Sequence, residues 1–303
     1  MGPGRISGLE FREDSKVSLL RINNNVSALN TQRNLNTNSF NLGKTLQKLS
    51  SGFRINTASD GPADLIISEG LRAQVSGLKA AVRNSQEASN LVGIAEGALK
   101  EVSDLLVSMR ALATHAANSG VVTTEQVAAD QEEVDNMLDT INRINAVTRF
   151  AGESIFTGAA RTFHIGEGGT AADQVNTLSI PIVSTGQIGG AAAPLRLRTI
   201  AGGQLNNLAL APQTAIQIIS AAAGQIASIR GTLGAFQKNT LQTNINSLNV
   251  SLENVTATES FIRDTNMAEE TSNFTKNQIL VQAGVSVLAQ ANVQSQSVLQ
   301  LLQ

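Results

Sequence analysis

The side chains that could do acid–base or metal chemistry are few in this chain of 303 residues. It has two histidines, His115 and His164, and no cysteine, so the nitrogen and sulfur ligand spacing of a zinc site does not occur. His164 is followed by Ile165, Gly166 and Glu167, which is not the two-histidine helix motif of a metalloprotease. The sequence therefore predicts no metal site.

A glycine-rich segment and scattered hydroxyl groups are the remaining candidates for chemistry. Gly166-Glu167-Gly168-Gly169 lacks the Lys-Ser/Thr pair of a phosphate-binding loop, so we interpret it as a turn. Ser, His and Asp all occur, but no nucleophile-elbow motif holds them. We therefore expect no catalytic residue, no cofactor and no enzymatic activity.

The composition favours long helices over a thick globular core. Hydrophobic residues make up 42% of the chain but aromatics only 3%, so narrow seams of Leu, Ile, Val and Ala must supply the burial. The net charge is −2 and no basic stripe occurs, which argues against nucleic acid and anionic membrane surfaces as partners. The apolar runs are too short for membrane insertion. No apolar block follows Arg5 and Arg12, so we expect no cleaved secretory signal.

Long helices are predicted in the first half of the chain, over about 24–53 and 62–118, with a third starting at Thr123. The third carries its apolar seam at Val134, Leu138 and Ile141. The second has the most regular pattern, in which apolar residues alternate steps of four and three. That spacing predicts a coiled-coil seam of Leu91, Ala95, Ala98, Val102, Leu105, Met109, Leu112 and Ala116.

The pattern changes between about Gly152 and Pro212, where glycines interrupt it. Alternation at 177–180 and at 195–198 predicts short strands or hairpins, and a helix returns by about Thr214. The part from about 166 to 190 is polar and has no seam, so we expect it to face solvent.

Both ends of the chain carry narrow apolar stripes that cannot bury themselves alone. Leu35, Leu42 and Leu49 recur every seven residues near the start, and Leu280, Val287 and further apolar residues form a stripe near the end. Leu288 and Leu299 have few local apolar partners. Asn and Gln crowd both segments. We expect these seams to pair with one another or with neighbouring copies, and to become fully ordered only on assembly.

The fold class that follows is mainly α, with long antiparallel helices in coiled-coil or bundle domains and a small β-hairpin-containing insert. The sequence predicts four parts. Residues 1–18 form an atypical N-terminal extension, and 19–60 with 265–303 form an inner terminal coiled coil. Residues 61–160 with 205–264 form a middle helical domain, and 161–204 form the insert.

Four ordered strings carry a family resemblance, namely SSGFRIN, SEGLRAQVSGL, AEGALKEV and QILVQAGVSVLAQAN. Over about 20–156 and 215–303 the chain resembles bacterial flagellin, in a short form without large outer domains. The resemblance implies a homopolymer, the extracellular flagellar filament used for swimming, and type III export without cleavage. It also implies an export chaperone, a filament cap and hook-junction proteins as partners. A hook–filament junction protein and an exported coiled-coil adhesin are the alternatives.

Two further features follow from the resemblance. Flagellins begin close to LRIN, here 20–23, so residues 1–18 are an atypical extension. The family's innate-receptor region corresponds to 107–114, where Arg110 and Leu112 match it, together with Glu133 on the next helix. Ser108 and Ala111 depart from the family pattern by replacing an Arg and a Glu.

Overall fold

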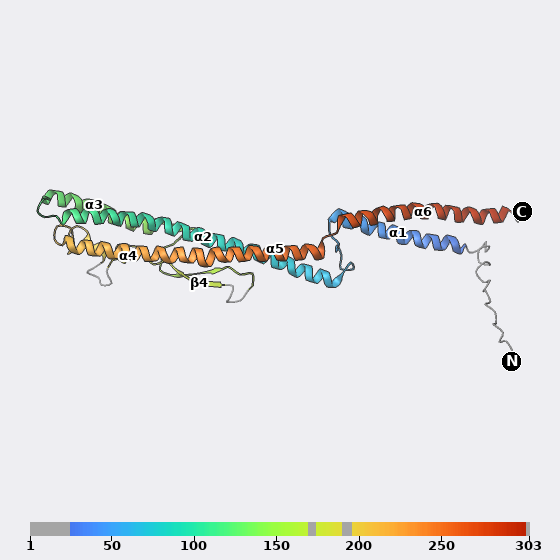
Figure 1. Ribbon diagram of the computed structural model, residues 1–303, viewed down its shortest axis with the longest axis horizontal. Helices are drawn as coiled ribbons and strands as arrows, with labels where there is room; N and C mark the ends of the chain where they lie inside the picture. The colour runs from blue at the N-terminus through green and yellow to red at the C-terminus, as the bar shows by residue number, and fades with distance from the viewer. Residues whose placement is uncertain (1–24, 169–173, 190–195, 301–303) are drawn as a thin grey trace, which may run out of the picture. The chain divides into compact units, whose positions relative to one another are not determined.

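The computed structural model describes residues 25–168, 174–189 and 196–300, without the side chains of 174–177 and 294–300. The predicted 1–18 extension lies outside the described residues. Long helices dominate, and the strands form small antiparallel pairs, which confirms the predicted mainly α fold (Figure 1). The helices are α1 (Val26–Ser51), α2 (Pro62–Ala116), α3 (Thr124–Val147), α4 (Pro212–Phe236), α5 (Thr243–Arg263) and α6 (Met267–Gln300).

Local capping chemistry sets the helix ends. The side chain of Asn25 accepts a hydrogen bond from the amide of Ala28 at the start of α1, and Gly52, with a φ of 75°, ends that helix in the left-handed conformation. Thr123 and Gln126 form a reciprocal capping box at the start of α3. The helices predicted over 24–53 and 62–118, and the restart at Thr123, are confirmed to within two residues.

The strands lie between α3 and α4. β1 (Arg149–Phe150) and β2 (Glu153–Ser154) form a hairpin whose two-residue turn has positive φ at Ala151 and Gly152, as a type I′ turn requires. β3 (Ala160–His164) pairs antiparallel with β4 (Gln174–Ser179), which confirms the alternation predicted near 177–180.

The second predicted strand, at 195–198, is wrong at 197–198, whereas residue 195 lies outside the described residues and Arg196 makes a single antiparallel bridge with Gly189. Leu197–Ile200 form the 3₁₀ helix η5, and both Leu197 and Ile200 are buried. Side chains three residues apart share one face of a 3₁₀ helix, so this segment turns two apolar residues toward the core with helical rather than strand spacing.

The chain forms two compact units. Among the described residues, those up to Leu71 and those from Ala257 onward make unit 1, and Arg72–Thr256 make unit 2. Unit 1 contains α1 and α6, and unit 2 contains α3, α4, the strands and most of α2. The finer division into terminal coil, middle domain and insert stays a prediction.

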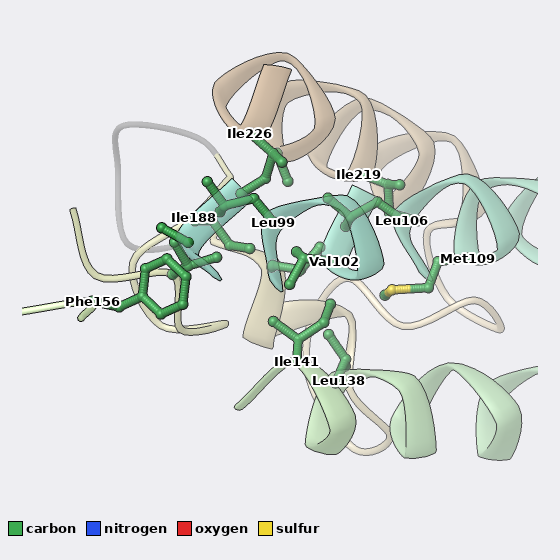
Figure 2. Close-up of a cluster of buried hydrophobic side chains, with 14 of the residues drawn as sticks. Leu99, Val102, Leu106, Met109, Leu138, Ile141, Phe156, Ile188, Ile219 and Ile226 are labelled. Atoms are coloured by element: carbon green, nitrogen blue, oxygen red, sulfur yellow. The ribbon is translucent and has the colours of Figure 1, made fainter. Parts of the chain in front are cut away.

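Unit 2 is built around the inner face of α2. Leu99, Val102 and Leu106 point into the space between α3 and α4 (Figure 2). Because elements cover α2 from several sides, its buried stripe is wider than a two-helix seam. Leu99, Leu106 and Ala113 are fully buried, whereas the predicted seam positions Ala98, Leu105 and Leu112 pack against the core from partly buried positions.

The expectation that 166–190 faces solvent is wrong for its second half. Leu178, Ile180, Val183 and Ile188 are all buried in the same cluster as α2 and α4. Figure 2 shows Ile188 beside Leu99. Isolated apolar residues between polar ones were enough to line one face of an irregular segment, and such a face has no helical or strand period to reveal it.

The burial of α2 generates a prediction about neighbouring leucines. Leu106→Ala should destabilise unit 2 by about 2–5 kcal/mol, since it opens a cavity in a fully buried site. Leu105→Ala should cost roughly half as much, because that side chain is only partly buried. Urea unfolding followed by helix signal measures both, with Val107→Ala, which removes an exposed side chain, as the control. Equal losses at positions 105 and 106 would contradict the observed register.

Candidate polymerisation surfaces

α1 and α6 lie side by side in unit 1 and run antiparallel (Figure 1). The side-chain nitrogen Nδ2 of Asn25 donates a hydrogen bond to the backbone carbonyl of Ala291 at 3.0 Å. A Cβ on Gly284 would lie 3.2 Å from a Leu35 methyl carbon, so the missing side chain at Gly284 leaves the space that Leu35 fills. These two contacts fix the lengthwise register of the pair.

Both helices show strict heptad burial along this seam. The seam positions of α1, all half-buried or buried, are Ala28, Thr31, Leu35, Asn38, Leu42, Thr45 and Leu49, and Lys44 and Lys48 are half-buried beside the seam. Those of α6 include Glu270, Phe274, Asn277, Val281, Gly284, Leu288 and Ala291. Leu35 contacts Gly284, and the two helices run antiparallel. Each step of three or four residues forward along α1 is therefore matched by the same step backward along α6, which pairs the two sets in reverse order.

This register gives the seam an uneven composition. It sets Leu42 opposite Asn277, Asn38 opposite Val281, and Leu49 opposite Glu270. In these layers a large apolar side chain faces a polar one, and at Gly284 Leu35 faces no side chain at all. Burial of apolar area drives coil formation, so such layers contribute less than paired leucines would. The α1–α6 coil is therefore a weak one.

Glu270 weakens the seam further. Its side chain is buried, and the carboxylate oxygen Oε1 has no hydrogen-bond partner among the described residues. A buried polar atom without a partner loses its hydration without replacement. The single subunit thus holds an unfavourable group at the first turn of α6.

The faces of α1 and α6 that point away from the seam carry exposed apolar side chains among polar ones. On α6, Ile279 and Val285 are more than half exposed, as is the predicted stripe residue Val287 at 53%. On α1, Leu29, Phe40 and Leu46 are more than half exposed. Large apolar side chains on the outside of a two-helix unit make these surfaces candidates for contact with another molecule.

The predicted seam residues separate into groups. Leu35, Leu42, Leu49 and Leu288 lie in the α1–α6 seam. Leu280 and Val287 lie on exposed parts of α6. Leu105 lies in unit 2, and the side chain of Leu299 is outside the described residues.

Sequence reasoning missed Phe274, Val281 and Gly284 as members of the seam. Heptad steps backward from Ala291 reach Gly284, and that signal could have found them. The α6 stripe was placed on a neighbouring face because α6 is apolar on several faces.

A polar connector joins α1 to α2 within unit 1. The Asp60 carboxylate accepts hydrogen bonds from the Lys44 ammonium at 3.1 Å, from the Thr57 amide at 3.0 Å and hydroxyl at 2.9 Å, and from the Asn56 amide at 3.3 Å. These donors, with Lys44 first, lower the pKa of Asp60 from 3.8 to about 2. The connector is therefore held by a carboxylate that stays ionised.

The connector also pairs with the segment between α5 and α6. The Arg54 amide donates to the Arg263 carbonyl at 2.7 Å, and the Arg54 guanidinium donates to the Ile262 carbonyl at 2.6 Å. Arg263 in turn pairs with Glu69 at 3.1 Å and lies over the ring of Phe53 at 4.7 Å. Unit 1 is thus tied at this end by backbone and guanidinium contacts rather than by a large apolar core.

The histidines are far from any catalytic arrangement. His115 Nδ1 lies 2.6 Å from an Asp130 carboxylate oxygen at the exposed end of α2, and the carbonyl of His164 accepts from the side chain of Asn84. Across the described ranges, no group of three or more His, Asp or Glu side chains could hold a metal ion. Within the same ranges, no helix has the length and apolar composition to cross a membrane.

The residues expected in the innate-receptor region lie on α2 and α3. Arg110 and Glu133 are exposed, whereas Leu112 packs against the core of unit 2. The guanidinium and the carboxylate are accessible on this chain, and the leucine is committed to internal packing.

Comparison with known proteins gives a consistent result. The model of the bacterial flagellin N-terminal helical region matches residues 22–161, and that of the bacterial flagellin C-terminal helical region matches residues 216–302. The chain is 38% identical to a flagellin of Bacillus subtilis (strain 168), over 93% of this chain and 100% of that protein. It is 36% identical to a flagellar filament core protein of Brachyspira hyodysenteriae, over 93% of this chain and 99% of that protein. A crystal structure of Bacillus cereus flagellin, at 26% identity, covers 55% of this chain and 88% of that chain with a TM-score of 0.43.

The Asp60 network makes the connector sensitive to acid. Its folded pKa lies below the unfolded value, so the stabilisation is complete above about pH 4 and is lost as the pH falls toward 2. In Asp60→Asn we expect the peptide 53–65 to exchange amide hydrogens faster than in the parent at neutral pH. That difference, taken relative to intrinsic exchange rates, should disappear near pH 2.

A second variant distinguishes the effect of the Lys44–Asp60 ion pair from acid unfolding caused by other carboxylates. Lys44→Met removes the main stabilising charge, so the Asp60 pKa should rise and protection of 53–65 should be lost at a higher pH than in the parent. The same pH dependence in the parent and in Asp60→Asn would show that other carboxylates control the connector.

Proposed function

The chain belongs to the bacterial flagellin family, and we propose which of its surfaces serve it as a subunit of the flagellar filament. It is a structural protein of the extracellular filament, with a role in motility. Matches to flagellins and filament core proteins over almost the whole chain favour this function over a hook–filament junction protein or an exported adhesin. The observation that carries the assignment of surfaces is the apolar outer side of α1 and α6.

The polymer contacts lie on that outer side. Leu280 and Val287, with Ile279 and Val285 beside them, are apolar side chains that the subunit itself does not cover. Contacts between different patches of identical subunits that do not close into a ring generate an open helical polymer. We place these residues, and Leu299 further along α6, in the contacts between subunits.

The α1–α6 seam serves the polymer indirectly. Leu35, Leu42, Leu49 and Leu288 hold the two helices together, but the layers they form with Asn277, Gly284 and Glu270 are weak. A weak coil gains stability when neighbours cover its outer side, because assembly then supplies burial that the monomer lacks. Full order of the coil accordingly depends on assembly.

The same weakness suits export. A subunit that leaves by the flagellar type III route must pass in an extended state, and a marginal coil is easily kept open. An export chaperone, the filament cap and hook-junction proteins are the further partners that this route requires. The protein has no enzymatic role in the proposal.

Innate-receptor recognition, where it occurs, depends on Arg110 and Glu133. Both are exposed, and Leu112 is turned into unit 2. Ser108 supplies no guanidinium where the family pattern has an Arg, so one set of bidentate donors is missing. We therefore expect weak recognition by such a receptor.

One prediction concerns the outer face of α6. Val287→Ser should leave unit 2 unchanged but raise the concentration of free subunit in equilibrium with filaments. Burying a valine contributes about 1.5 kcal/mol, which corresponds to roughly a tenfold change. Sedimentation of filaments from free subunits measures it. Gln290→Ser, at another exposed position of α6, is the matched control and should have little effect. A similar rise in both variants, or in neither, would remove Val287 from the contacts.

Another prediction concerns the weak layers. Asn277→Leu should give Leu42 an apolar partner and slow amide exchange of 26–51 and 267–293 in the dilute monomer by roughly tenfold. Gln278→Leu adds the same side chain at an exposed position and should not slow exchange. If the parent coil is already as protected in the monomer as in the filament, its order does not depend on assembly.

A further inference from the structure

The inner face of α2 in unit 2 keeps one unbroken heptad phase. One set of buried positions alternates steps of three and four without a break, and Leu91, next to Val92, is buried beside it. The set is Leu78, Ala81, Ser85, Ala88, Val92, Ala95, Leu99, Val102, Leu106, Met109, Ala113 and Ala116. A helix packed along this face should show an equally regular phase.

The partner helix does not keep one phase. On α4, Ile219, Ile226 and Leu233 are buried at steps of seven. Leu241, near the end of the segment 237–242 that follows α4, and Leu248 on α5 are again seven apart. Between Leu233 and Leu241 the step is eight. In a regular α-helix an added residue rotates everything after it by about 100° around the axis. An uninterrupted helix could therefore bury only one of the two groups on the face of α2.

The extra residue coincides with a change of helix type. Gln237–Gln242 form the π-helical segment η6 between α4 and α5. In a π-turn the backbone bonds reach five residues back, so each turn holds more residues and each residue turns the chain by less. The hydroxyl of Thr243 likewise donates to the carbonyl of Lys238, five residues earlier, at 3.4 Å. The wider turn absorbs the extra residue and returns Leu241 and Leu248 to the buried face.

Polar contacts fix both ends of this segment. The side chain of Gln237 donates to the Ser89 hydroxyl at 3.2 Å, and that of Asn244 donates to the Ser85 hydroxyl at 3.3 Å. Asn244 also donates to the carbonyl of Ile165 at 2.9 Å, directly after β3. The phase after η6 therefore decides whether Asn244 meets both α2 and the hairpin.

We propose that the wider turn of η6 accommodates one inserted residue. This residue sets the phase in which α5 packs on α2, and that phase places Asn244 where it binds the β3–β4 hairpin. The device is local to 237–242. Removing one residue there should convert the π-turn to α-helix and leave the packing on both sides in place. Removing a residue elsewhere in the same helical run should not.

Three single deletions in the full-length chain test the proposal. Asn239 lies in η6, Ser228 in α4 and Asn249 in α5, and all three are exposed. Deletion of Asn239 should leave the melting temperature of the monomer equal to the parent's or higher. Deletion of Ser228 or Asn249 should lower it by roughly 10 °C or more, because each rotates buried residues away from the α2 seam.

Hydrogen exchange supplies a second readout that melting alone does not. The peptide 160–168 should stay as protected as in the parent after deletion of Asn239, since Asn244 still reaches Ile165. It should lose protection after deletion of Ser228, which changes the phase of Asn244 relative to the first part of α4, including in a variant that stays helical. Deletion of Asn249 lies beyond Asn244, so it should lower the melting temperature without first exposing this peptide. The proposal is overturned if deletion of Asn239 prevents folding, lowers the melting temperature as much as the flanking deletions, or exposes 160–168. It is also overturned if all three deletions are tolerated equally.

Discussion

The number of elements that cover a helix stripe controls the stability of each part of this protein. α2 is flanked by α3, α4 and the segment around Ile188, so leucines and alanines along it lose nearly all contact with water. Among the described residues, α1 and α6 pack mainly on one another, and most of their seam stays half exposed. With almost no large aromatics to add buried area, the chain has one firm unit and one weak unit.

The sequence predicted most of the helical architecture because capping and periodicity are local signals. Pro62 and Thr123 mark helix starts that the structure confirms. The phase of each seam was harder to predict. On α2 it was blurred by two apolar residues in succession, such as Leu105 and Leu106. On α6 it was hidden because Gly284, which has no side chain to count as apolar, receives Leu35.

What the sequence did not reveal depends on contacts between distant residues. Val183 and Thr185 are held by hydrogen bonds to Asn145 and Asn142 of α3, and Leu208 donates to Gln131. Asparagine and glutamine side chains that the sequence alone would place in solvent thus hold the irregular segment between α3 and α4 against α3. The π-turn at 237–242 belongs to the same class, since it becomes visible only when the phases of two helices are compared.

The proposed subunit folds stably in unit 2 and completes the folding of its ends only on assembly, and the buried polar groups of unit 1 support that division. In unit 2 the buried hydroxyls of Ser85 and Thr185 have hydrogen-bond partners, although Arg230 Nε has none among the described residues. In unit 1 the carboxylate of Glu270 has an atom with no partner among the described residues. The heptad register inferred from the Leu35–Gly284 contact also sets Asn277 opposite Leu42. Replacing such groups with leucine would strengthen the monomer but narrow the difference between free and assembled states. In the proposed assembly, that difference is what couples folding of the ends to polymer growth.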